Sequence, residues 1–209
     1  MSMNENHVSL LITVPVCSFR KGYAREYLET ELIPPPSTIY GFLLALIGET
    51  DRYVYNHSYI AYAITSMPEL STLIRTTWRI KKKKEPQGQK ENRSPDYQQI
   101  LSQLELVIWI REGPLADKVQ AGKDFSTINR FGGLSLGESK DLVNDVIWFP
   151  KIDQLKGHWV LPQPNGNLSL PIWVDHVGSK DTIWQQFQLH YDHLEPLSFN
   201  DHRWIDIHH

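Results

Sequence analysis

Apolar and polar residues alternate along several stretches of the chain, which is the pattern of strands that bury one face. The clearest case runs from Val8 to Val14, where every second residue is Val, Leu or Ile. β-Branched and aromatic residues, which favour strands, are common in the other stretches. The pattern predicts five strands, over 8–14, 59–65, 72–80, 104–110 and 143–149.

A helix is predicted after the three consecutive prolines at 34–36, because prolines cannot continue a helix and hold the backbone extended. Ser37 has a hydroxyl that can cap the first amides, and Gly48 is placed to end the helix. The positive end of such a helix can bind phosphate, and a capped core helix without a ligand is the alternative. The apolar residues recur at helical spacing, as Ile39, Phe42, Leu43, Leu46 and Ile47.

A second, shorter helix is predicted to begin at Pro114, with Leu115 and Val119 on its apolar face. The stretch 81–103 is polar and basic, and we interpret it as a protruding hairpin or loop inserted between two strands. With that insertion set aside, the order is β-α-β-β-α-β. This order defines the ferredoxin-like fold, which RNA-recognition (RRM-like) modules share. The sequence therefore predicts an α+β domain over residues 1–150.

The pattern weakens after Pro150, and 151–209 is predicted to be a small, β-rich C-terminal extension. We expect a hairpin around Asn165 and Gly166. We also expect a helix over 181–189, because Ile183 and Phe187 would share one face. Seven of the nine histidines follow Lys156. Because they form no compact set of ligand pairs, a solvated, His-rich tail is expected and no metal site.

The composition is that of an ordinary globular protein, with 41% hydrophobic and 22% charged residues. No apolar run approaches the roughly 20 residues that a membrane helix needs, so no membrane partner is expected. The first residues are polar and lack the apolar region of a signal peptide. The single cysteine, Cys17, forms no internal disulfide and suits a reducing compartment, so a cytoplasmic location is expected.

Charge is distributed unevenly along the chain. The formal net charge is −3, but the stretch 75–93 holds eight basic and two acidic residues. A cationic segment on an otherwise acidic protein favours a local contact with a polyanion. Arg75, Trp78 and Arg79 lead into the run 81–84 of four lysines, so cations and a stacking ring stand together, as nucleic-acid binding requires. A solvated, flexible loop is the alternative.

The glycine-rich loop 130–139 resembles a phosphate-binding loop but lacks its chemistry. A P-loop needs a lysine after its last glycine, whereas Gly137 is followed by Glu138, which would repel a nucleotide phosphate. Amides of the Gly132–Gly133 turn can still approach a nucleic-acid backbone, with Arg130 and Phe131 beside them. A tight turn before a strand is the alternative.

Catalytic signals are weaker than binding signals. Cys17 has no sequence signature of a nucleophile, and it is expected to serve packing. His57 could act as a general acid, but no pattern selects it. No catalytic residue and no cofactor is therefore expected.

Three motifs together resemble the Cas-five family, a RAMP-superfamily subunit of type I CRISPR effector complexes (Cascade). The motifs lie at 14–20 (VPVCSFR), 34–44 (PPPSTIYGFLL) and 132–139 (GGLSLGES). The stretch that begins at Arg25 and the strand 75–79 look like the compact variety of type I-B-like systems, some of which serve Tn7-like transposons. The resemblance covers roughly residues 8 to 150.

The resemblance implies a non-catalytic RNA-binding subunit, with a ferredoxin-like domain and a thumb-like hairpin, here about 81–103. Such a subunit holds the 5′ handle of the guide RNA (crRNA), caps the filament of Cas-seven subunits and docks the Cas-eight large subunit. Target DNA would be read by guide pairing, for defence or for transposition with transposon targeting proteins. The residues expected at the RNA are Arg20, Lys21, Arg25, Ser37, Thr38, Tyr40, Arg75, Trp78, Arg79, Lys81, Lys82, Lys83, Lys84, Arg93, Arg130, Phe131, Gly132, Gly133, Ser135 and Leu136.

Two other functions remain as alternatives. One branch of the family cleaves precursor crRNA without a metal, using Tyr, Lys and His, and this chain has no histidine within 81–103 or within the glycine loop. The other alternative is a ferredoxin-like interaction or ligand-sensing domain that binds no nucleic acid.

Overall fold

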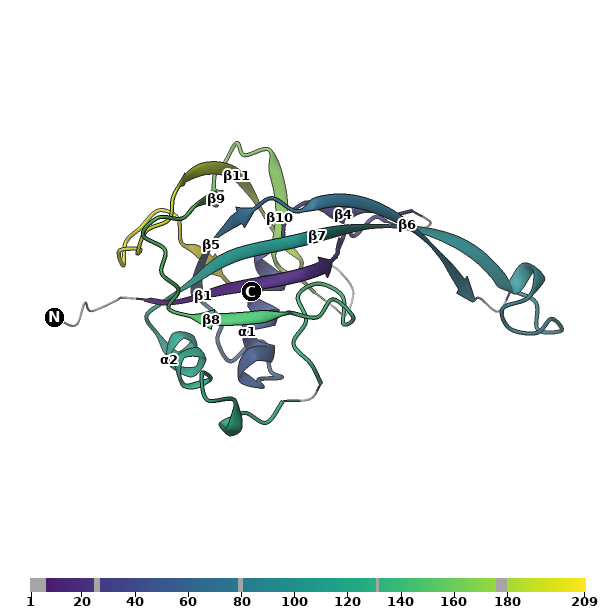
Figure 1. Cartoon of the computed structure of the whole chain (residues 1–209), viewed down its shortest axis with the longest axis horizontal. Helices are drawn as coiled ribbons and strands as arrows, with labels where there is room; N and C mark the ends of the chain where they lie inside the picture. The colour runs from purple at the N-terminus through teal and green to yellow at the C-terminus, as the bar shows by residue number, and fades with distance from the viewer. Residues whose placement is uncertain (1–6, 25–26, 79–80, 131, 176–179) are drawn as a thin grey trace.

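A large antiparallel sheet forms the centre of the molecule in the computed structural model, which describes residues 7–24, 27–78, 81–130, 132–175 and 180–209 (Figure 1). The helices are α1 (Pro36–Ile47) and α2 (Pro114–Ala121), with single 3₁₀ turns at Lys90–Asn92 and Phe125–Thr127. The strands are β1 (His7–Cys17), β2 (Phe19–Arg20), β3 (Tyr27–Leu28), β4 (Thr30–Glu31), β5 (Ser58–Ser66), β6 (Glu69–Trp78), β7 (Arg93–Arg111), β8 (Asp145–Trp148), β9 (Lys156–Pro162), β10 (Leu168–Trp173), β11 (Ile183–His193) and β12 (Ile205–Ile207).

The large sheet follows the order β10-β11-β9-β5-β7-β1-β8, with β12 paired to β5 and both β3 and β6 paired to β7. The pairs are antiparallel except β3 with β7. A separate two-stranded sheet joins β2 and β4. The α+β class predicted from the sequence is confirmed.

Both faces of the sheet are covered. On one face, α1 and α2 pack against alternate residues of β1, β5 and β7, and this main core includes Leu10, Ile39 and Leu43, which are fully buried. On the other face, the segments around β9 and after β11 enclose a second core, in which the rings of Trp109 and Trp159 stack 4.5 Å apart. Burial on both faces explains why β7 is apolar without alternation from Leu106 to Ile110.

The prolines place the start of α1 as predicted, but Ser37 does not cap it. The N-cap is Pro35, Pro36 occupies the first turn, and no side chain caps the helix. The amides of Thr38 and Ile39 donate to the Pro35 carbonyl, and Pro35 and Pro36 have no N–H. Ser37 therefore has the single free N–H among residues 35–39. The predicted phosphate site therefore has few amide donors, because proline has no N–H. Gly48 ends the helix in the left-handed conformation, as predicted.

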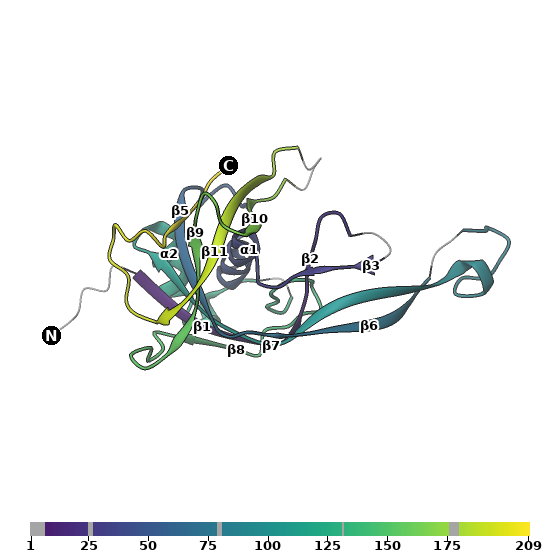
Figure 2. The ribbon, with the colours of Figure 1, turned by 90° about the horizontal axis from the view of Figure 1, so that it is seen from above.

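A long hairpin of β6 and the first half of β7 projects from the body (Figures 1 and 2). It begins at Glu69 and Ser102, so the projection starts before the stretch 81–103 that the sequence marked as the insertion. Its tip is ordered by the buried side chain of Asn92. The Asn92 carbonyl accepts the amides of Lys81 and Lys82, and its NH₂ group donates to the carbonyls of Lys82 and Glu85.

Three expectations for the C-terminal extension are wrong. β9 and β10 do not pair with each other around Asn165 and Gly166, because each pairs with β11. The stretch predicted as a helix over 181–189 belongs to β11, since the spacing of Ile183 and Phe187 fits one face of a strand as well as of a helix. The histidine-rich end is no solvated tail, because β12 joins the sheet beside β5.

The boundary proposed near residue 150 remains a prediction, and the strands β9 and β12 that follow it pair with β5 of the same sheet. Within the described residues, none of the helices combines the length and the apolar composition of a membrane span.

The structure predicts that Ile207→Ala lowers the free energy of unfolding by about 2–5 kcal/mol, because the Ile207 side chain is fully buried in the main core. Ile74→Ala is the matched control, since Ile74 is 67% exposed on the hairpin. Urea unfolding measures both variants. Equal, small effects would contradict the placement of β12 in the sheet.

Candidate nucleic-acid interface

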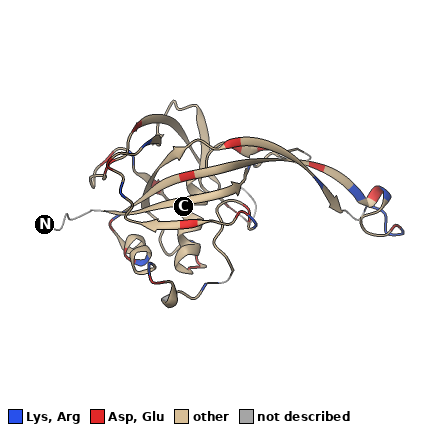
Figure 3. Ribbon diagram, in the orientation of Figure 1, with Lys and Arg blue, Asp and Glu red and all other residues tan. Residues whose placement is uncertain are grey.

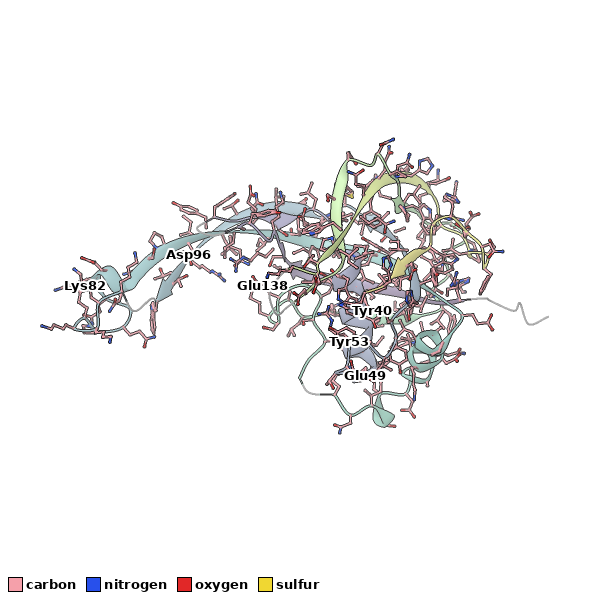
Figure 4. The ribbon with its side chains drawn as sticks, turned by 180° about the vertical axis from the view of Figure 1, so that it is seen from behind. Tyr40, Glu49, Tyr53, Lys82, Asp96 and Glu138 are labelled. Carbon is pink, nitrogen blue, oxygen red and sulfur yellow. The ribbon has the colours of Figure 1, made fainter. Side chains whose placement is uncertain are left out.

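The tip of the hairpin carries the cationic stretch of the sequence (Figure 3). Lys81, Lys82, Lys83 and Lys84 are all exposed, and Lys82 forms an ion pair with Glu91. Exposed lysines on a projecting tip are placed to contact and neutralise phosphates. Figure 4 shows Lys82 at the far end of the hairpin, Asp96 along it and Glu138 where it meets the body.

One face of the hairpin is exposed and partly aromatic. Trp78 and Ile74 on β6 are 63% and 67% exposed, and their cross-strand neighbours on β7 are Arg93 and Tyr97. The Trp78 ring packs on Gly88 of the tip, where an added Cβ would lie 2.9 Å from the indole. Ring and cation therefore share one face, which is suited to stacking a base beside a phosphate contact.

The glycine loop is fixed to the end of β1 by the buried carboxylate of Asp141. One Asp141 oxygen accepts hydrogen bonds from the Ser18 amide at 2.9 Å, the Ser18 hydroxyl at 3.3 Å and the Glu138 amide at 2.9 Å. Gly137 lies between these groups with φ +114°, and an added Cβ would lie 2.6 Å from the Ser18 carbonyl oxygen. The loop is thus a rigid turn whose conformation requires glycine.

Glu138 connects this loop to the base of the hairpin. It pairs with Lys140 at 3.0 Å and accepts from the Gln98 side chain on β7 at 3.2 Å. Burial acts to raise the pKa of Glu138, but Lys140, Gln98 and the charge of Arg75 together lower it below its usual value. The carboxylate that excludes a P-loop therefore stays ionised and holds loop and hairpin together.

The structure separates the two halves of the glycine loop. Ser135 and Gly137 line a cleft of about 340 Å³ with Ser37 and Thr38 of α1. The preceding segment runs toward the other end of α1, where the Asn129 carbonyl oxygen would be 2.6 Å from a Cβ at Gly48. The predicted residues of the loop therefore do not form one site.

The predicted residues of the glycine loop differ in their exposure to solvent. Arg130 is half-buried, with its guanidinium 5.6 Å from the Phe125 ring, and it lines a separate cavity. Gly132 and Gly133 are exposed, whereas the Leu136 side chain is fully buried in the main core. The Leu136 side chain is therefore not available to RNA. Phe131, together with Arg25 and Arg79, lies outside the described residues.

Two residues of the cleft, Arg52 and Trp173, were missed by the sequence analysis. The Arg52 guanidinium lies 4.0 Å from the centre of the Trp173 ring and donates to the Val174 carbonyl. Tyr40, which was predicted, is buried and donates its hydroxyl to the Arg52 carbonyl at 2.7 Å, and burial raises its pKa to about 12. Arg52 stands in a loop without periodicity, so no spacing in the sequence marks it.

Arg20 and Lys21 line a second cavity of about 320 Å³, and Val174 lines both this cavity and the cleft. The Arg20 guanidinium donates to the Ala24 carbonyl at 2.7 Å and so shapes the turn 20–24. The cationic turn, the start of α1 and the second half of the glycine loop therefore form one continuous surface beside the hairpin base.

Cys17 and His57, the residues considered for catalysis, have different surroundings. Burial, assisted by the negative charge of Asp141, raises the pKa of Cys17 to about 12, so its thiol stays protonated. His57 stacks on His208 at 6.2 Å, and both rings lie within 3.7 Å of Asp206. The described part of the chain contains no group of three or more His, Cys, Asp or Glu residues arranged for a metal ion.

We predict that Gly137→Ala lowers the free energy of unfolding by about 1–3 kcal/mol, because a side chain there is strained and meets the Ser18 carbonyl. Gly133→Ala is the control, since its Cβ would approach only the flexible end of Leu142 at 3.3 Å. Urea unfolding of both proteins tests this difference. If the two variants lost equal stability, the loop would not be held as described.

Known proteins resemble this chain in sequence and in fold. A curated protein of Myxococcus xanthus (strain DK1622), "CRISPR-associated protein Cas5", is 41% identical over 187 residues, which cover 85% of this chain and 87% of that protein.

No protein-family model matches the chain. A chain of a "CRISPR RNA-guided surveillance complex" shares the fold with a TM-score of 0.66 at 10% identity, over 89% of this chain and 90% of that one. A "Cas protein" crystal structure does so with a TM-score of 0.52 at 12% identity, over 88% and 94%. Because the curated relative is this similar over most of both chains, the chain belongs to the CRISPR-associated Cas5 family, the Cas-five family of the sequence analysis.

Proposed function

We propose that the chain is a non-catalytic subunit of a type I CRISPR effector complex, in which it binds the 5′ handle of the guide RNA. The observation that carries this proposal is the continuous surface at the hairpin base, where Arg20, Lys21, Ser37, Thr38 and Ser135 line two adjoining cavities. Cations and hydroxyls are the groups that hold a ribose-phosphate backbone.

The hairpin extends this surface and supplies long-range attraction. Its lysines lie at the end of a projection, whereas Arg75 lies close enough to Glu138 for its charge to lower the pKa of that carboxyl at the hairpin base. RNA held at the base could therefore reach the tip along one side of the projection. We assign the hairpin as the thumb of the family on this ground, and the exposed face with Trp78 and Ile74 as a contact surface for the RNA or a neighbouring subunit.

The strand order supports the ferredoxin-like assignment. Within the large sheet, β8-β1-β7-β5 are neighbours, α1 connects β1 to β5, and α2 connects β7 to β8. In this assignment, β6 and the outer half of β7 are an insertion in the central hairpin. The complex would include Cas-seven backbone subunits, which this chain caps, and a Cas-eight large subunit in the cytoplasm. Target DNA would be read by pairing with the guide. Transposon targeting proteins would be partners where the system directs a transposon.

The same surface gives no support to RNA cleavage. His57 lies in a separate cavity beside Arg111 and Glu112, and it is not among the residues that line the two cavities at the hairpin base. General acid–base cleavage needs its proton donor within hydrogen-bond reach of the reacting phosphate. We therefore propose binding without cleavage.

Replacement of all four lysines 81–84 by alanine is expected to weaken binding of labelled repeat RNA. The slope of log affinity against log salt should flatten by about 0.7 for each lysine that neutralises a phosphate. Binding is measured in EDTA at several salt concentrations, and a denaturing gel of the same samples should show intact RNA.

The matched control replaces four other exposed lysines, Lys118, Lys123, Lys151 and Lys156, and so changes the net charge equally. Its salt slope should stay that of the unchanged protein. Equal slopes for all three proteins would show that the tip does not contact RNA. Specific scission in EDTA that disappears in His57→Ala would favour the endoribonuclease alternative.

A further inference from the structure

The cavity beside Arg20 and Lys21 contains a carboxylate, which is unexpected on a surface for a polyanion. Glu31 of β4 lines this cavity together with Tyr23 and Trp184. We call it the Glu31 pocket. Its volume of about 320 Å³ lies in the range of roughly 300–1,000 Å³ that is typical of small-ligand sites. Because the Glu31 carboxylate would repel a phosphate, a nucleotide bound in this pocket would place its base or sugar there.

The Glu31 carboxylate accepts no hydrogen bond from any group in the described part of the chain. It is half-buried, and burial raises its pKa above the usual value, although the nearby charge of Lys21 acts in the opposite direction. A half-buried carboxylate without donors loses solvation that no hydrogen bond within the protein replaces. The pocket therefore favours a ligand that brings N–H donors to Glu31.

Aromatic rings stand at the same cavity. Tyr23 is 91% exposed on the turn 20–24, and Trp184 is 45% exposed on β11, which belongs to the large sheet. Exposed rings beside a pocket suit a flat ligand, because bases of single-stranded RNA stack on aromatic side chains. Arg20 and Lys21 supply the positive charge that would hold the adjoining phosphates.

We propose that the Glu31 pocket binds one unpaired guanine base of the guide RNA, with the Glu31 carboxylate accepting from the N1–H and the 2-amino group. The inference rests on the proposed RNA-binding function and assigns a specificity-determining residue to it. Guanine is selected because its Watson–Crick edge presents two adjacent N–H donors, which match the two oxygens of one carboxylate. Uracil, cytosine and adenine each present a donor next to an acceptor on that edge.

The test uses the full chain and a set of eight-residue oligouridines in which one position is changed to guanosine, inosine, adenosine or cytidine. Inosine is the decisive base, because it keeps the N1–H of guanine and lacks the 2-amino group. Fluorescence anisotropy measures affinity at fixed salt. We expect guanosine at one position to bind roughly 5- to 100-fold more tightly than the other bases, with inosine between them.

Glu31→Gln should remove this preference, because an amide offers only one acceptor oxygen to the two donors. The salt slope should stay unchanged, because it depends on the phosphate contacts. Glu29→Gln is the matched control, since Glu29 is exposed just before β4, does not line the pocket and loses the same charge. Trp184→Ala should weaken binding of every base by about fivefold or more through lost stacking.

The outcomes separate the two claims. Salt-dependent binding without any base preference, or a guanine preference that survives in Glu31→Gln, overturns this inference and leaves the proposed function standing. Absence of binding to every oligonucleotide overturns the proposed function and this inference with it.

Discussion

The buried carboxylate of Asp141 is the interaction on which the candidate interface depends. It accepts from the amide and hydroxyl of Ser18 and from the amide of Glu138, and so it joins the end of β1 to the glycine loop. A buried carboxylate is costly unless several donors compensate it, and here they come from two segments far apart in sequence. From Glu138 the connection continues to Gln98 on β7. Loop, sheet and hairpin base are thereby held in one arrangement.

The hairpin extends this arrangement outward. β7 is 19 residues long, with its second half in the core and its first half in the projection, so the direction of the hairpin is set by a strand anchored on both faces. A two-stranded ribbon alone is marginally stable in water. Asn92 compensates locally by ordering the tip, while the exposed Trp78 and Ile74 leave an apolar face uncovered. A cationic, partly apolar projection of this kind is suited to a partner that covers it.

Much of the body could be predicted from the sequence, because alternation and helical spacing report burial directly. Four of the five expected strands and the two helices that begin after the prolines and at Pro114 lie close to their observed places, whereas the strand expected over 104–110 is only the second half of β7, which begins at Arg93. The prediction of a helix over 181–189 was wrong because Ile183 and Phe187 are four residues apart, and residues at this separation share one face of a helix and also one face of a strand. Ser37 does not cap the helix because the N-cap is Pro35, two residues earlier. The solvated tail expected at the end of the chain was wrong, because the prediction rested on the histidines, whereas Ile205 and Ile207 are fully buried.

The candidate site was predictable only in part. The motifs around Arg20, Ser37 and Gly137 are each visible in the sequence, but Asp141, which joins Ser18 to the glycine loop, stands in no motif. Arg52, Trp173 and Glu31 have ordinary neighbours in sequence and acquire their roles through tertiary contacts. The resemblance to the Cas-five family predicted the family of the chain, and the curated relative confirms it. The contacts with RNA remain proposals.

The central claim is that RNA lies on the surface formed by the turn 20–24, the start of α1 and the second half of the glycine loop. Photo-crosslinking of the chain to repeat RNA that contains 4-thiouridine, followed by peptide mass spectrometry, tests it most directly. Two exposed aromatic residues, Tyr23 and Trp184, line the cavity at this surface, and two others, Phe125 and Phe149, lie beside α2 and β8. The account predicts crosslinks in the peptides that contain Tyr23 and Trp184. Crosslinks confined to the peptides with Phe125 and Phe149 would contradict it.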